Sequence, residues 1–101
     1  MKGEYTYIKS KHPNRVPVII ITKDFELTKK KFLVDENECF STLFFEIRKH
    51  IKLNMKDSVL FLVEHEIVIP SQNIGEFHRR ICMKKDDKFM YILLQKNQTF
   101  G

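Results

Sequence analysis

Glycine and proline are scarce in this chain, and so are long apolar runs. Its 101 residues include three glycines and three prolines against nine phenylalanines, a balance that argues for a compact fold and against disorder. The longest apolar runs, VPVIII and VLFLV, have the length of a strand, whereas a helix that spans a bilayer needs about 20 apolar residues. We expect one domain, because a chain of this length holds a single core.

Targeting and metal-binding motifs are also lacking. The first nine residues, MKGEYTYIK, have no apolar segment of the signal-peptide type, and Lys2 stands where N-myristoylation needs glycine. Cys39 and Cys82 have neither the spacing of a metal-binding pair nor the position of a prenylation site. We therefore expect reduced thiols in a cytoplasmic protein, with no metal and no cofactor.

A net charge of +5 raises the question of nucleic-acid binding. The basic residues are spread over the whole chain, in KSKHPNR, TKKK, IRKHIK, FHRR and MKKDDK, and no nucleic-acid-binding motif accompanies them. We favour a solvated basic surface and expect no nucleic-acid partner. A basic nucleic-acid-binding module stays as the less favoured alternative.

The first third of the chain predicts a short helix and a hairpin. Residues 1–11 form a polar lead-in that suits one or two helical turns, ending before His12-Pro13. The continuous β-branched run from Val16 predicts a strand covered on both faces, with Pro17 near its start, where a missing N–H does least harm. Lys30 to Asp35, KKFLVD, predicts a second strand paired with the first.

The remaining segments predict an α+β fold. NECFSTLFFEIRKHIKL predicts an amphipathic helix, because apolar residues recur there at three- and four-residue spacing: Phe40, Leu43, Phe44, Ile47 and Ile51. DSVLFLVE and KFMYILLQ predict strands, EIVIP fits a further short strand, and IGEFHRRI predicts a short helix. The order matches a ubiquitin-like β-grasp, with a mixed four-stranded sheet and helices on one face. We expect this domain to span residues 12–95 and a flexible tail to span residues 96–101.

The segment KHPNRVPVII resembles the motif Lys-Tyr-Pro-(Asp/Asn)-Arg-(Val/Ile)-Pro-Val-(Ile/Val) of the autophagy ubiquitin-like modifiers. This family includes the GABA-A-receptor-associated protein and the microtubule-associated-protein light chains. The similarity continues in KKKFLV, IRKHIKL, DSVLFLV, DDKFMYI and the final TFG, in the family's order, with one short insertion near Ile81 to Lys85. Two departures stand out: His12 replaces the tyrosine, and only one short helix fits where the family has two, so the N-terminal helical extension is shortened.

The resemblance implies a non-catalytic modifier that acts through its last residue, Gly101. E1-like and E2-like enzymes would activate this glycine and join it to phosphatidylethanolamine on autophagic membranes. The protein would be a cytoplasmic monomer before conjugation and would lie on the autophagosomal membrane afterwards, where it recruits cargo receptors and adaptors. Because the sequence stops at Gly101, we expect it to be conjugated without a processing protease.

The resemblance also implies that partners dock an aromatic-x-x-aliphatic motif at the edge strand KKKFLVD. An exposed edge can accept an extended peptide as a further strand, and lysines there both limit aggregation and attract acidic flanks. The aromatic pocket maps to Glu4, Ile8, Pro17, Ile19, Lys31, Leu33 and Phe89. The alternative is that Ile8, Ile19 and Leu33 are ordinary core residues.

The aliphatic pocket maps to Phe32, Val34, Asp35, Glu38, Leu43 and Glu46. Three of these positions are acidic here and apolar in the family, so either the pocket is reshaped or the choice of ligand has shifted. Arg15 and His50 match family positions that contact acidic ligand residues, and His50 would do so weakly near neutral pH.

Two other functions compete with this hypothesis. A sister modifier that joins a protein lysine shares the fold and the aromatic-glycine end but usually lacks a block like KHPNRVPVII. A thiol–imidazole enzyme would use His78 and Cys82, one helical turn apart, yet no nucleophile motif surrounds either cysteine. Asp86-Asp87 lacks the spacing of a calcium loop and predicts a turn.

Overall fold

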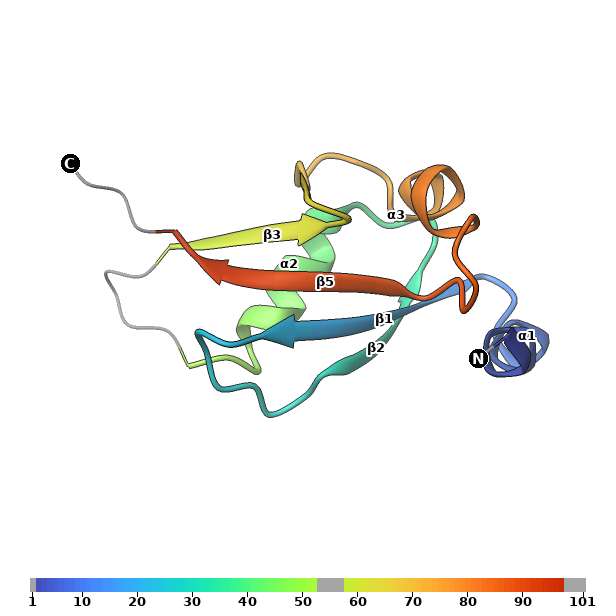
Figure 1. Cartoon of the computed structure of the whole chain (residues 1–101), viewed down its shortest axis with the longest axis horizontal. Coiled ribbons are helices and arrows are strands. Elements are labelled where there is room, and N and C mark those ends of the chain that lie inside the picture. The colour runs from blue at the N-terminus through green and yellow to red at the C-terminus, as the bar shows by residue number, and fades with distance from the viewer. Residues whose placement is uncertain (1, 53–57, 98–101) are drawn as a thin grey trace.

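A single mixed sheet organises the computed structural model, which describes residues 2–52 and 58–97 (Figure 1). The elements along the chain are α1 (Lys2–Lys11), β1 (Arg15–Thr22), β2 (Lys31–Asp35), α2 (Phe40–Arg48), β3 (Val59–Val63), β4 (Glu66–Ile67), α3 (Ile74–Phe77), the π-helical turn η1 (His78–Cys82) and β5 (Met90–Lys96). The order of strands and helices predicted from the sequence is confirmed.

The strands lie in the order β2-β1-β5-β3-β4. β1 pairs antiparallel with β2 and parallel with β5, while β3 pairs antiparallel with both β5 and β4. The sheet has five strands rather than four, because the chain reverses through Glu64 and His65 and lets the two-residue β4 pair with β3. Both turn residues have positive φ, 51° and 68°, as a two-residue hairpin turn requires.

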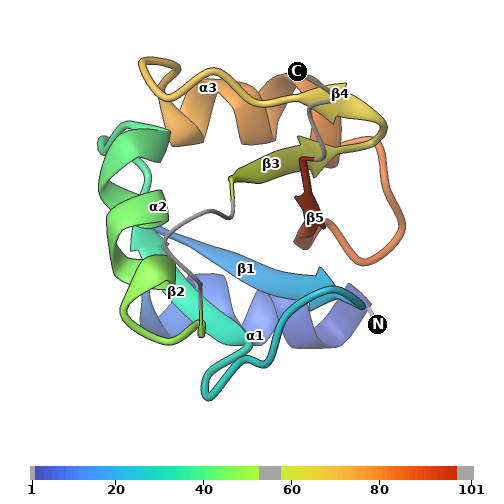
Figure 2. The same cartoon turned by 90° about the vertical axis from the view of Figure 1, so that its left-hand side faces the viewer.

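Helix α2 covers one face of the sheet and closes the core (Figure 2). Its buried side chains pack on those of the strands, and the rings of Phe44 and Phe61 stack with centroids 3.6 Å apart. Cys39, which precedes the helix, provides no side-chain cap. The helix start is held instead by the segment before α3, since Phe40 N–H donates to the Gln72 carbonyl and Ser41 N–H to the Pro70 carbonyl.

Helix α2 is shorter than the sequence predicts. It ends at Arg48, and Lys49 and His50 close its last turn with bonds to the carbonyls of Glu46 and Ile47. Ile51 therefore lies outside the helix, where it bridges to Leu27 and still packs against the core. Periodicity alone does not distinguish a last helical turn from an apolar residue that follows the helix.

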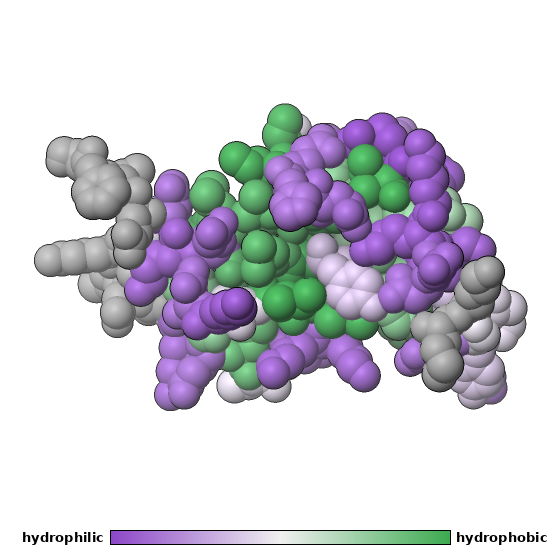
Figure 3. Space-filling view, viewed as in Figure 1, coloured by the Kyte–Doolittle hydropathy of each residue, from purple (hydrophilic) through white to green (hydrophobic). Residues whose placement is uncertain are grey.

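The opposite face of the sheet is only partly covered. Val16, Val18 and Ile20 are buried toward α2, whereas Ile19 is half-buried and Ile21 is 45% exposed. The prediction that this strand is covered on both faces is therefore wrong for its second half. Figure 3 shows apolar side chains gathered over the middle of this open face.

Helix α1 packs against the start of β1, at one end of the sheet. It has 10 residues, more than the one or two turns expected, and it ends before His12-Pro13 as predicted. The Tyr5 ring stacks on His78, with centroids 5.8 Å apart. Lys9 Nζ donates to the carbonyls of Pro13 and Arg15 at 2.6 and 3.3 Å. These contacts hold the helix against η1 and the start of β1.

Candidate functional site

Strand β2 forms the outer edge of the sheet, since β1 is its one neighbour among the described strands. Ile20 N–H donates to the Lys30 carbonyl across the pair at 2.7 Å. Because such bonds alternate along an antiparallel pair, Phe32 and Val34 bond to β1, while Lys31 and Leu33 turn their N–H and C=O groups outward. β2 therefore offers an open backbone edge next to exposed Lys31 and Leu33 side chains.

The first pocket, a cavity of about 220 Å³, lies on the α1 side of β2. It brings together all seven residues that the resemblance assigns to an aromatic pocket, together with Val18, Phe32 and Tyr91. Ile8 and Ile19 are half-buried, and Leu33 is 42% exposed. The alternative that these three residues are ordinary core is therefore wrong.

The turn before β5 positions two aromatic walls of this first pocket. Asp87 Oδ1 accepts the N–H of Phe89 at 3.1 Å, and the Tyr91 hydroxyl donates to the other carboxylate oxygen. The bond to Asp87, with burial, raises the pKa of Tyr91 to about 12, so its hydroxyl stays a donor at neutral pH. Tyr91 enters the pocket because β5 runs parallel to β1 with Tyr91 opposite Ile19.

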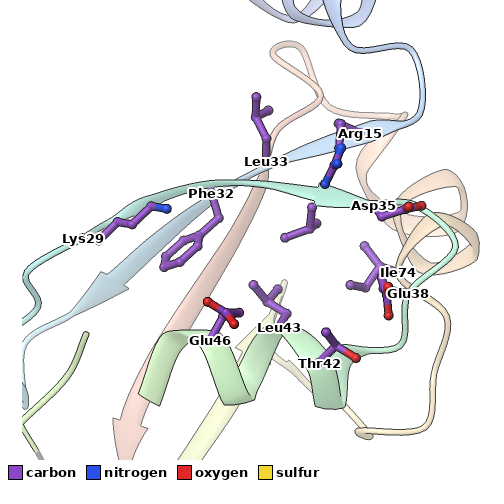
Figure 4. Close-up of a pocket in the computed structure, with 11 residues that line it drawn as sticks. Arg15, Lys29, Phe32, Leu33, Asp35, Glu38, Thr42, Leu43, Glu46 and Ile74 are labelled. Carbon is purple, nitrogen blue, oxygen red and sulfur yellow. The ribbon is translucent and has the colours of Figure 1, made fainter. Parts of the chain in front are cut away.

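The second pocket, a cavity of about 330 Å³, lies between β2 and α2 (Figure 4). Its apolar floor includes Phe32, Leu43 and Ile74, which are all buried. All six positions that the resemblance assigns to an aliphatic pocket line it, and so do four further residues outside the floor: Arg15, Lys29, Leu33 and Thr42. The two pockets thus lie on opposite sides of the same edge strand.

Charged side chains surround the second pocket. Three acidic residues and two basic residues line it: Asp35, Glu38, Glu46, Arg15 and Lys29. Glu46 pairs with Lys49 at 3.0 Å, and Lys29 Nζ lies 4.7 Å from the centre of the Phe32 ring. The pocket therefore combines an apolar floor with a rim that is acidic in sum.

His50 lies outside the lining of both pockets. Its ring meets that of Phe32 edge-on, with centroids 5.9 Å apart, and Nδ1 lies 3.2 Å from Thr28 Oγ1. The sequence analysis did not assign Tyr91, Lys29 or Ile74 to either pocket. Lys29 belongs to the lysine run of the edge, whereas Ile74 and Tyr91 reach the pockets through pairings that only the topology fixes.

The thiol considered for catalysis resists ionisation, and the imidazole considered with it is hydrogen-bonded to the backbone. Cys82 is fully buried, and this burial raises the pKa of its thiol to about 11. His78 Nε2 donates to the Lys88 carbonyl at 2.7 Å. A thiol this far from ionisation is a poor nucleophile.

Residues 2–52 and 58–97 contain no group of three or more side chains arranged to hold a metal ion. Over the same residues, no helix has both the length and the apolar character needed to cross a bilayer.

The last strand, β5, leads to the C-terminal residues. Gly101, the expected conjugation site, and residues 98–100 are outside the described residues. Residues 96 and 97, which the sequence predicts to belong to the tail, are held by the sheet: Lys96 belongs to β5 and donates its N–H to Asp24, and Asn97 N–H donates to the Ser58 carbonyl. β5 ends at the end of the sheet away from α1 (Figure 1).

A hairpin, a crossover helix on one face and a last strand inserted at the centre of a mixed sheet define a ubiquitin-like protein. The crystal structure of Trypanosoma brucei ATG8 has this fold: it matches with a TM-score of 0.80 and 20% sequence identity, over 99% of this chain and 88% of that one. Residues 2–101 match the family described as autophagy protein Atg8, ubiquitin like. The chain belongs to the Atg8 ubiquitin-like family.

Proposed function

We propose that this protein is an autophagy modifier that is joined through Gly101 to phosphatidylethanolamine and recruits partners through the edge of β2. Membership of the Atg8 family supports the first part. The pair of pockets on opposite sides of β2 carries the second part. Before conjugation the protein is a cytoplasmic monomer, and afterwards it decorates the autophagosomal membrane.

Strand geometry explains why a docked peptide would carry two anchors three residues apart. A peptide that adds to β2 pairs with the outward groups of Lys31 and Leu33. Successive side chains of a strand point to opposite faces, so residues separated by an odd number of positions reach opposite pockets. Three residues span about 10 Å along a strand. An aromatic residue enters the first pocket, and the third residue after it enters the second.

Conjugation through Gly101 would require its carboxylate to enter the active sites of the conjugating enzymes. E1-like and E2-like enzymes supply the activation, and this chain supplies the carboxylate. Glycine has no Cβ, so the tip can enter a narrow active-site passage and adopt dihedrals closed to other residues. The match to the Atg8 family over residues 2–101 favours the lipid over a protein lysine as the acceptor.

Backbone amide shifts provide a direct test of docking. We expect an unlabelled aromatic-x-x-aliphatic peptide to shift the amide signals of Lys31 and Leu33 in the labelled protein and to slow their hydrogen exchange. Signals of β4, at the other edge of the sheet, are the internal control. Shifts that gather on β4 or on the open face, with β2 unaffected, would rule out docking at this edge.

A further inference from the structure

We propose that the second pocket selects a lysine or an arginine in place of an aliphatic residue. The inference rests on the proposed docking of peptides at β2 and names the residue that occupies the third position after the aromatic anchor. The cavity and its apolar floor define the site, and the carboxylates at its rim decide which side chain fits it.

The pocket offers apolar contact and negative charge to the same side chain. Figure 4 shows Phe32, Leu43 and Ile74 around the cavity, with Glu46 on one side and Asp35 and Glu38 on the other. A lysine or arginine can lay its methylene stem on an apolar surface and keep its charge at the rim. A leucine would cover the same floor but would strip water from the carboxylates without pairing them.

The cations of the pocket are not ion-paired with its carboxylates. Within residues 2–52 and 58–97, neither Arg15 nor Lys29 forms an ion pair with Asp35, Glu38 or Glu46. Lys29 is placed over the Phe32 ring.

Glu38 and Glu46 are the carboxylates that remain for a ligand. Asp35 is already engaged, because its Oδ1 accepts the N–H of Asn37 at 2.9 Å. The partner of Glu46, Lys49, is 54% exposed. Exposed pairs of this kind are weak, so a ligand cation can compete for the carboxylate.

Matched peptides test the proposal. Three otherwise neutral peptides share an aromatic anchor and differ in the third residue after it, which is leucine, lysine or norleucine. We expect calorimetry at low salt to give the lysine peptide about threefold to tenfold tighter binding than the other two, because its ammonium group can pair with a rim carboxylate and the other side chains cannot. Raising the salt concentration to about 0.5 M should remove most of that advantage.

Two variants test whether Glu38 and Glu46 cause the preference for lysine. In the double variant Glu38→Gln/Glu46→Gln, the lysine peptide should lose its advantage while the leucine peptide binds at least as well as before. Glu76→Gln removes an exposed carboxylate of α3 that lies outside this pocket. This variant should still bind the lysine peptide more tightly than the leucine and norleucine peptides.

The outcomes distinguish a failure of the lysine selectivity from a failure of peptide docking at β2. A leucine peptide that binds as tightly as the lysine peptide, or a lysine preference that survives Glu38→Gln/Glu46→Gln, overturns the basic selectivity and leaves docking in place. A fourth peptide, with alanine at the aromatic position, should bind much more weakly than its parent. If all four peptides fail to bind, docking at β2 is contradicted together with the selectivity.

Discussion

Gly75 lies where the backbone of α3 passes close to the chain that follows β2. Its N–H donates to the Glu36 carbonyl at 2.9 Å. A Cβ added at Gly75 would lie 2.7 Å from that carbonyl oxygen and 3.0 Å from the Glu36 Cβ. These distances are shorter than atomic contacts allow, so the two segments pack this closely only because residue 75 has no side chain.

We expect Gly75→Ala to destabilise the protein by about 1–3 kcal/mol, because the crowded backbone has to shift. Gly3→Ala is the matched control: no atom lies within 4 Å of its added Cβ, and alanine favours the helix by up to about 1 kcal/mol. Urea unfolding measures both. Equal stability of the two variants would contradict the close packing of α3 against the Glu36 segment.

His78 makes stability depend on pH. Burial is the main cause that lowers its pKa, aided by Lys9 and Arg79, while the bond to the Lys88 carbonyl and the charge of Glu36 act in the opposite direction. The folded protein therefore binds this proton less readily than the unfolded chain. The stability is complete above the unfolded pKa, about 6.5, and falls as pH drops from there toward the lowered folded pKa.

Comparison with His78→Gln isolates this effect, because glutamine can still donate an N–H and does not titrate. We expect the free energy of unfolding of the native protein to fall more between pH 7.5 and 5.5 than that of the variant. The other three histidines are present in both proteins, so their contributions cancel. The same pH dependence in both proteins would show that His78 is not the titrating group.

Strand β2 carries the proposed binding. The side chains of Lys31 and Leu33 are exposed, so substitutions there should not disturb the core. We expect Leu33→Ala and Lys31→Glu each to weaken the affinity for an aromatic-anchored peptide by about threefold to tenfold. The first substitution removes apolar surface from the first pocket, and the second reverses a charge there. Calorimetry gives the affinities.

Leu93→Ala is the matched control for Leu33→Ala. Leu93 is 38% exposed, close to the 42% of Leu33, but it lies on β5 and outside both β2 pockets. It should leave the affinity unchanged. Equal effects of Leu33→Ala and Leu93→Ala would show that binding does not depend on β2.

Replacing the acidic rim by apolar residues tests the second pocket as an element of its own. Glu38→Leu/Glu46→Leu should tighten binding of an aromatic-x-x-leucine peptide, because added apolar surface contributes about 25 cal/mol per Å² buried. Circular dichroism would check that the fold is kept. Affinity that falls or stays level would show that the two rim carboxylates do not oppose an aliphatic ligand.

For the molecule as a whole, the sequence predicts local elements better than the surfaces they leave uncovered. The apolar run of β1 and the three- and four-residue spacing in α2 are local, so both elements are visible in the sequence. Whether Ile21 is covered depends on what packs over the face of the sheet opposite α2, and the run of β-branched residues is the same in either case.

Some residues of the candidate site could be predicted from the sequence, and others depend on how the strands pair. The acidic residues of the second pocket are plain in the sequence, and family resemblance maps them to one place. Tyr91 reaches the first pocket through the parallel pairing of β1 with β5, two strands that are far apart in sequence. No local pattern encodes that register, which explains why this residue was missed.

The proposed function depends first on conjugation through Gly101. An incubation of the protein with the E1-like and E2-like enzymes, ATP and phosphatidylethanolamine liposomes, read by intact mass, tests it most directly. We predict an adduct of one phosphatidylethanolamine less one water on the native chain. Gly101→Ala and a chain without Gly101 should show none, while both keep the fold and peptide binding. A native chain without the adduct, or a chain that lacks Gly101 and still gains the lipid, would contradict conjugation through Gly101.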